Sequence, residues 1–151
     1  MSVSSQPAFT PERRRTLHAV VGRILPGSES PGAVAAGVAA GFETAMLHPF
    51  FRGLRPGIEG VLDRLRSQAG QLYAKDFCAC AMGEQDELLR ALERDPNPWM
   101  RFLFRSLIGF TLEGFLGDPT HGGNRSFLGW EALGLRAEDV RSGFCRGARG
   151  D

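Results

Sequence analysis

The sequence predicts an all-α protein: a single-domain, compact helical bundle of about five to six helices with a long C-terminal loop region. Three observations predict this class. Apolar residues recur at helical spacing in several segments, residue pairs typical of helix starts precede those segments, and no segment alternates apolar and polar residues as a strand does. With 151 residues, of which 42% are apolar and 23% charged, the chain has the size and composition of one globular domain.

Residues 1–9 are expected to form a flexible tail, and residues 10–151 a single helical domain. The first helix is expected to begin at Thr10-Pro11-Glu12, because Thr is a favoured N-cap, Pro fits the first turn, and an acid there suits the helix dipole. Its apolar side consists of residues at the spacing of one helix face, namely Leu17, Val20, Val21, Ile24 and Leu25. Pro26-Gly27 ends it.

Three further helices are expected before residue 95. Residues 31–47 are rich in Ala and Gly, which permits close approach of another backbone; both a buried core helix and a helix at a subunit contact fit this composition. Residues 58–69 and 83–93 each carry aliphatic residues on one face and charged residues on the other.

The fifth expected helix, residues 99–116, is apolar on almost every side. Its charged residues Arg101, Arg105 and Glu113 are placed in one narrow row with Gly109. A helix of this kind is normally surrounded by protein. It is therefore predicted to be either the central helix of the domain or a helix shared with a partner. After it, the only further helix expected is a short one near residues 137–141.

The residue spacings do not predict a catalytic, cofactor-binding or metal site. There is no phosphate-binding loop, dinucleotide fingerprint or nucleophile elbow, and the three His residues are far apart in sequence. Cys78 and Cys80 are too close for the usual zinc spacing and are interpreted as small buried residues. A net charge of +1 gives no electrostatic case for nucleic acid, and no apolar run is long enough for direct membrane insertion.

The segment 117–130 is the strongest candidate for an interaction site. It is dense in Gly, Asp, Pro, Asn and Arg, and it follows the most apolar helix. Loops carry binding residues more often than helices do, and Arg and Trp are the residue types that anchor interfaces. A structural loop held by its own side chains fits the same composition. The residues alone leave both interpretations open.

Three stretches resemble the gluconate 2-dehydrogenase subunit 3 family. The first is Arg23-Ile-Leu-Pro26 followed by Ser30-Pro-Gly-Ala33, and the second is Phe77 followed by Gln85-Asp-Glu-Leu-Leu89. The third and most specific is Thr111-Leu-Glu-Gly-Phe115, then Gly117-Asp-Pro119, Gly122-Gly-Asn-Arg125 and Gly129-Trp130, similar to the family's T-x-E-G-F, GDP-x-Y-GGN-R and GW motifs. The resemblance covers roughly residues 10–135.

This resemblance implies a small accessory subunit that is not catalytic alone. It would bind and stabilise, in a chaperone-like way, the FAD-containing catalytic subunit of a glucose–methanol–choline (GMC) type sugar dehydrogenase, in a heterodimer or larger complex. The FAD is expected in that partner, with no cofactor in this chain, and a cytochrome c or another acceptor would receive the electrons. The residues expected to contact the partner come from the third stretch: Glu113, Phe115, Asp118, Pro119, His121, Gly122, Gly123, Asn124, Arg125 and Trp130.

Two departures from the family pattern matter. His121 stands where the family usually has Tyr, so a role of that Tyr hydroxyl is not carried over. The twin-arginine export signal often found in the family is not visible: Arg13-Arg14-Arg15 is followed by a stretch that contains His18 and Arg23 and lacks a clean apolar region. A cytoplasmic dehydrogenase, such as a glucoside 3-dehydrogenase, is therefore expected, or a periplasmic one if a signal has been removed.

Two alternative functions remain. One is a helical adaptor or regulator unrelated to dehydrogenases, with Arg13–Arg15 as its contact patch. The other is an enzyme that works alone and uses His121, Asp118 and Arg125 as an acid–base cluster. The balanced charge and the 111–130 motif favour the accessory subunit over both.

Overall fold

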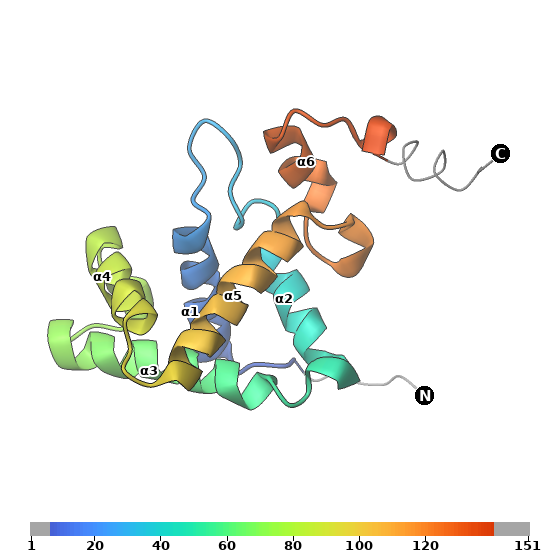
Figure 1. Cartoon of the computed structure of the whole chain (residues 1–151). Coiled ribbons are helices and arrows are strands. Elements are labelled where there is room, and N and C mark those ends of the chain that lie inside the picture. Colours follow the sequence, from blue (N-terminus) through green and yellow to red (C-terminus); the bar gives the residue numbers. More distant parts are fainter. Residues whose placement is uncertain (1–6, 141–151) are drawn as a thin grey trace.

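The computed structural model describes residues 7–140, and within them all regular structure is helical (Figure 1). The predicted all-α bundle is confirmed. The helices (α) and short 3-10 turns (η) follow one another along the chain as α1 (Pro11–Ile24), α2 (Val38–Leu47), η1 (Pro49–Phe51), α3 (Arg55–Tyr73), η2 (Phe77–Ala79), α4 (Met82–Glu93), α5 (Pro98–Leu116), η3 (Pro119–His121), η4 (Arg125–Phe127) and α6 (Leu128–Ala132).

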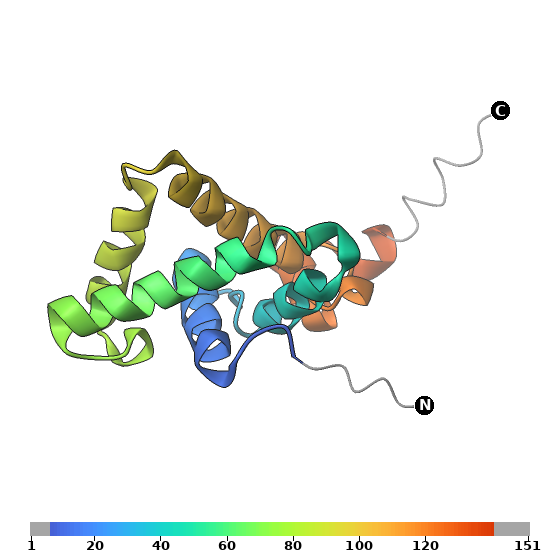
Figure 2. The same cartoon turned by 90° about the horizontal axis from the view of Figure 1, so that it is seen from below.

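Helix α5 is the central element of the bundle. It packs against α1, α2, α3, α4 and α6. Figure 1 shows it running diagonally, with α4 on one side, α2 on the other and α6 near its C-terminal end. Seen from below, in Figure 2, α3 lies across the ends of α1 and α5. The sequence prediction of a central fifth helix is therefore confirmed.

The helical periodicity of the sequence corresponds to a continuous apolar core. The residues that α1, α3 and α5 direct inward are fully buried and include Leu17, Ile58, Leu62, Leu65 and Leu107. Burying one such side chain contributes about 1.5–3 kcal/mol relative to leaving it in water. The packing of these faces against one another stabilises the bundle.

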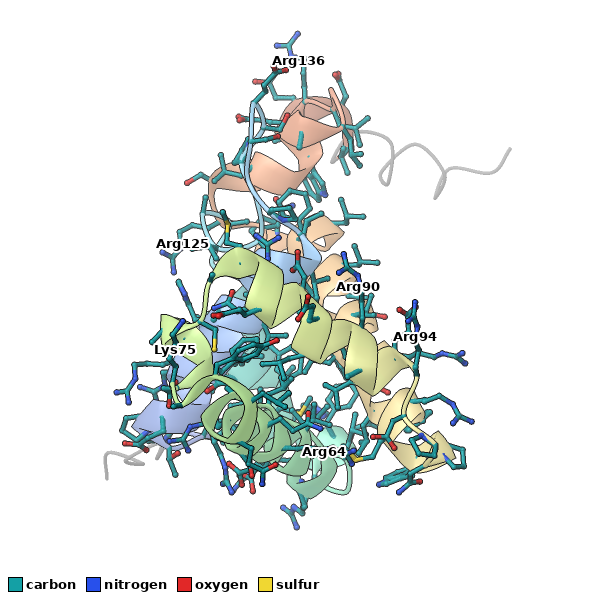
Figure 3. All side chains as sticks on the ribbon, turned by 90° about the vertical axis from the view of Figure 1, so that its left-hand side faces the viewer. Arg64, Lys75, Arg90, Arg94, Arg125 and Arg136 are labelled. Carbon is teal, nitrogen blue, oxygen red and sulfur yellow. The ribbon has the colours of Figure 1, made fainter. Side chains whose placement is uncertain are left out.

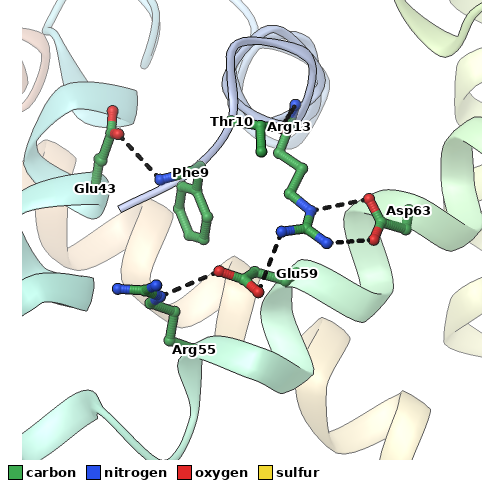
Figure 4. A network of polar contacts seen from close by, with 7 residues as sticks. All are labelled: Phe9, Thr10, Arg13, Glu43, Arg55, Glu59 and Asp63. Carbon is green, nitrogen blue, oxygen red and sulfur yellow. Dashed lines mark hydrogen bonds and ion pairs between the residues drawn. The ribbon is translucent and has the colours of Figure 1, made fainter. Parts of the chain in front are cut away.

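Arginine–carboxylate pairs connect the first helix to its neighbours. The Arg13 guanidinium donates to both carboxylate oxygens of Asp63, at 3.0 and 2.6 Å, and lies 3.2 Å from Glu59 (Figure 4). Arg23 makes the same two-bond contact with Asp86, at 2.8 and 2.9 Å. These hydrogen bonds hold the pKa of Asp63 and of Asp86 below the ordinary range of an aspartate. They link α1 to α3 and to α4.

Two residues assigned to the flexible tail are packed against the bundle, contrary to the prediction. Ala8 and Phe9, assigned to the tail from the sequence, are buried, and the Phe9 amide donates to Glu43 at 3.3 Å (Figure 4). Phe9 packs against Phe42 with the ring centres 6.4 Å apart. Apolar burial therefore orders the chain before the Thr10 N-cap, which does accept from the Arg13 amide as expected.

Helix α2 begins later than predicted, at Val38 instead of residue 31. Gly37 has φ +70°, a left-handed conformation that separates a preceding turn from the helix. Helix α3 is longer than the predicted 58–69, and α4 and α5 match their predicted segments within one residue. The predicted C-terminal loop region contains η3, η4 and the unpredicted α6, whereas residues 137–140 are helical as expected.

The described residues do not cover the fifth helix on every side, so the alternative of a helix shared with a partner stays open beside its central position. Trp99, Phe102, Leu112 and Leu116 are between 40% and 53% exposed. Arg101 begins the row that continues with Arg105 and Glu113, but its side chain turns back to donate to the carbonyl oxygens of residues 95 and 96. One face of α5 is thus an apolar surface without cover from the described residues.

Candidate partner-binding site

Asn124 determines the path of the 117–130 segment, which leaves α5 and turns back against it. Its side chain is fully buried; Nδ2 donates to the Gly117 carbonyl at 2.8 Å, and Oδ1 accepts from the Gly129 amide at 2.7 Å. Because buried backbone groups need partners, one amide side chain satisfies both ends of the segment. The Asn also tolerates the left-handed backbone at this position, with φ +46°.

Glycines allow the segment to lie directly on the backbone of α5. A Cβ on Gly129 would lie 1.7 Å from the Phe115 carbonyl oxygen, and a Cβ on Gly123 would lie 2.1 Å from the Gly114 carbonyl oxygen. A Cβ on Gly41 of α2 would likewise lie 2.7 Å from the carbonyl carbon of Gly122. No side chain fits in these contacts, so the glycines of the motif have a packing reason within this chain.

Trp130 and Arg125 complete the attachment of the segment. The Trp130 indole Nε1 donates to the Leu116 carbonyl at 2.7 Å, satisfying one of the last carbonyls of α5. The Arg125 amide donates to the Ala36 carbonyl at 2.9 Å, and its guanidinium lies against Gly37. The segment therefore joins α5 to the turn before α2.

The turn at residues 124–127 is strained. Besides Asn124, Ser126 and Phe127 have left-handed φ values of +56° and +62°. Such conformations cost about 1–3 kcal/mol each for ordinary residues and persist only where surrounding contacts impose them. The buried hydrogen bonds of Asn124 and Trp130 supply those contacts.

A groove of about 570 Å³ opens between α2, η1, α5 and η3. Its floor is apolar, formed by Phe42, Phe51 and Phe110, whose rings pack edge to face with centres 4.9–5.3 Å apart. Polar and glycine residues form the rest of its wall: Gly41, Thr44, His48, Glu113, Gly114, Gly117, Asp118, Thr120, His121, Gly122 and Gly123. Apolar pockets with few polar groups are the usual form of a binding site.

The structure separates the ten predicted partner-binding residues into two groups. Phe115, Gly123, Asn124 and Trp130 are buried and hold the segment in place. Pro119 is partly buried, and the rest reach the surface: Glu113, Asp118, His121, Gly122 and Arg125. The structural interpretation therefore applies to the buried residues, and the contact with a partner stays a prediction for the exposed ones. Arg125 does not line the groove.

The sequence analysis missed His48, which lines the groove, and two exposed apolar residues close to it in the chain. Phe50 is 81% exposed, Leu47 is exposed one turn earlier, and His48 lines the edge of the groove, with Nδ1 accepting from the Phe50 amide at 3.2 Å. The sequence shows only a helix end at His48-Pro49. The available signal was a Phe directly after such a break, but the sequence does not show whether that Phe is exposed.

The groove does not assemble the proposed acid–base cluster. His121 and Asp118 line it, whereas the Arg125 guanidinium lies against Gly37 on the far side of the turn. The Asp118 carboxylate caps η3 by accepting from the Thr120 amide at 2.9 Å. In the contact patch of the adaptor interpretation, Arg13 and Arg14 form ion pairs with acids of α3 and α2, whereas Arg15 is exposed.

The other chemistry-bearing groups of residues 7–140 form no further site. No three His, Cys, Asp or Glu side chains of this range are grouped to hold a metal ion, and none of its helices is long and apolar enough to cross a membrane. Cys80 is buried as predicted, but Cys78 is exposed, contrary to the prediction. Partial desolvation and the nearby Asp76 carboxylate raise the pKa of the Cys78 thiol, and burial raises the pKa of Cys80, so neither is activated as a nucleophile.

Fold and groove together define a helical protein with an apolar groove beside the 117–130 segment. The family model described as Gluconate 2-dehydrogenase subunit 3 matches residues 11–135, so the chain belongs to that family. Membership implies that it is a subunit of a dehydrogenase complex. Neither the curated proteins nor the solved structures give a significant match.

Proposed function

We propose that this chain is a non-catalytic accessory subunit that binds and stabilises the FAD-dependent, GMC-type catalytic subunit of a sugar dehydrogenase. The observation that carries the proposal is the groove. Family membership adds that the chain is a subunit of a dehydrogenase complex. Its aromatic floor and its exposed rim residue Phe50 can accept an apolar side chain of another protein.

The 117–130 segment supports this role by being fixed before binding. Since Asn124, Gly129 and Trp130 hold it against α5, the groove wall loses little conformational entropy when a partner docks. His121 and Asp118 stand on that wall and supply polar contacts at the rim. In this proposal the flavin and sugar sites are in the catalytic subunit, which passes electrons to a cytochrome or another acceptor.

Co-expression with a GMC-type flavoprotein tests the proposal. The wild-type chain is expected to co-purify with the flavoprotein and to increase the yield of dye-reducing sugar dehydrogenase activity. Phe50→Ala should weaken the complex by about tenfold or more, because an exposed aromatic anchor at an interface typically contributes over 1 kcal/mol.

Leu72→Ala is the matched control, since Leu72 is also an exposed apolar residue but lies near the C-terminal end of α3, away from α2 and the groove (Figure 1). It should leave the affinity unchanged. Equal affinities for the two variants would show that the groove is not part of the interface. If the yield and activity of the flavoprotein were the same with and without this chain, the accessory role itself would be contradicted.

A further inference from the structure

The exposed face of α5 carries a row of residues that the groove does not use. We call it the α5 face and define it by Trp99, Phe102, Arg105, Gly109, Leu112, Glu113 and Leu116. Trp99 and Phe102 stack with ring centres 5.1 Å apart. Only Glu113 is shared with the groove. An uncovered apolar helix face of this kind is typical of a protein–protein contact.

Gly109 lies at the centre of this face and has no packing reason within the described chain. A Cβ placed on it would meet no atom within 4 Å, whereas a Cβ on Gly114 in the same helix would meet Val38 at 3.1 Å. Gly60 and Gly70 of α3 are equally open, and Gly109 differs from them in lying at the centre of an exposed apolar face. A glycine at that point permits close approach of a second backbone from outside.

The sequence of the face is self-complementary about Gly109. Arg105 and Glu113 stand four positions before and after it, and Phe102 and Leu116 seven positions before and after. At about 100° per residue, Phe102 and Leu116 lie on the same side of the helix as Gly109, with Arg105 and Glu113 about 40° to either flank. Neither Arg105 nor Glu113 forms an ion pair with another residue of 7–140.

We propose that the α5 face binds a second copy of this chain, with the two α5 helices antiparallel and Gly109 of each at the two-fold axis. In that arrangement Arg105 of each copy is level with Glu113 of the other. Because these two residues lie on opposite flanks of the helix, the two axes cross at Gly109 so that the side chains meet, as they do when the i±4 rows of two helices pack together. A two-fold interface joins the same patch of both partners, so a positive residue of the patch has to meet a negative residue of that same patch. A different partner would require no such symmetry within a single helix.

The pairing goes beyond the proposed function and does not depend on it. Every groove residue other than Glu113 lies outside the α5 face. Two paired copies would therefore each present the groove to a catalytic subunit, which gives an assembly with two copies of each chain.

Sedimentation velocity of the purified chain alone tests the pairing. The wild type is expected to be dimeric at micromolar concentration. Arg105→Glu alone and Glu113→Arg alone should each weaken self-association by tenfold or more, because like charges would then be level across the axis. An equimolar mixture of the two single variants should restore the dimer, and so should the double variant R105E/E113R, since both restore opposite charges at each level.

Two further variants separate pairing from folding. Arg94→Glu makes the same change of charge as R105E at an exposed arginine in the C-cap of α4, off the face, and should not alter the dimer (Figure 3). Gly109→Leu should prevent close approach while retaining the helix, because Leu is a good helix former. A monomeric wild type, or a double variant and mixture that stay as monomeric as R105E, would overturn the proposal.

Discussion

Different interactions stabilise the part of the molecule built from α1, α3 and α4 and the part built from α2 and the 117–130 segment. The first has an aliphatic core and arginine–carboxylate pairs such as Arg23 with Asp86. The second has backbone-to-backbone contacts at glycines and side-chain hydrogen bonds to backbone groups. Helix α5 packs against both. The difference shows that the interaction groove depends on contacts that leave no room for a larger residue.

The largest effect should come from adding one methyl group to the second part. Gly129→Ala places a Cβ 1.7 Å from a carbonyl oxygen of α5, so the segment cannot close as it does now. A loss of more than about 3 kcal/mol in the free energy of unfolding is expected, measured by urea titration.

Gly60→Ala is its control in the first part. Nothing lies within 4 Å of a Cβ there, and Gly60 is inside α3, so the change should stabilise the chain by about 0.5–1 kcal/mol. If Gly129→Ala cost no more than about 1 kcal/mol, the close glycine contact of the 117–130 segment would not exist in solution.

The next largest effect concerns the aliphatic core. Leu62 is fully buried in α3, and Leu62→Ala should destabilise the chain by about 3 kcal/mol through lost burial and a cavity. The exposed Leu72→Ala should cost under about 0.5 kcal/mol by the same titration. Similar losses for both would mean that α3 does not face the core as described.

An intermediate effect is expected for the side chain that closes the segment. Asn124→Ala removes two buried hydrogen bonds and leaves Ala in a left-handed conformation, at a cost of about 2 kcal/mol. Hydrogen exchange should become faster in residues 117–130 while α3 keeps its protection. Asn97→Ala, which removes only the exposed cap of α5, should leave exchange in that segment unchanged; equal acceleration would contradict the role of Asn124.

The smallest effect concerns an ion pair of the first part and depends on pH. Because the hydrogen bonds from Arg23 lower the pKa of Asp86, their contribution is present above the ordinary aspartate pKa near 4 and is lost as the pH falls through the lower folded value. Asp86→Asn should therefore cost about 1 kcal/mol at pH 7, and this difference should shrink towards zero near pH 2.

Urea titrations at a series of pH values measure that difference. Glu138→Gln removes an ion pair with Arg136 whose two side chains are mostly exposed, and should change little at any pH. A cost of Asp86→Asn that is independent of pH would show that the pair acts through packing and not through charge.

The same comparison explains what could be predicted from the sequence. The first part was predictable because Leu17, Ile58 and Leu65 repeat with the period of a helix and are indeed core residues. The late start of α2 was not, since Gly37 reads as one more small residue of a helix until its φ is known. Periodicity reports local burial and carries no information on a left-handed residue fixed by distant contacts.

The candidate site was predictable as a segment but not in its internal roles. Asn124 and Trp130 are residue types that can either contact a partner or satisfy backbone groups, and only their burial shows the second role. Phe50 was missed because its exposure depends on how η1 follows α2. The family motif pointed to this segment, whereas tertiary structure was needed to separate its supporting residues from its surface residues.

Hydrogen–deuterium exchange of the chain, alone and bound to a GMC-type flavoprotein, tests the central claim most directly. We predict slower exchange on binding at the C-terminal end of α2, in η1 and in residues 117–123, which border the groove, with no change in α4. Protection confined to α4 or to the C-terminal half of α3, with the groove segments unchanged, would contradict the claim that this groove binds the catalytic subunit.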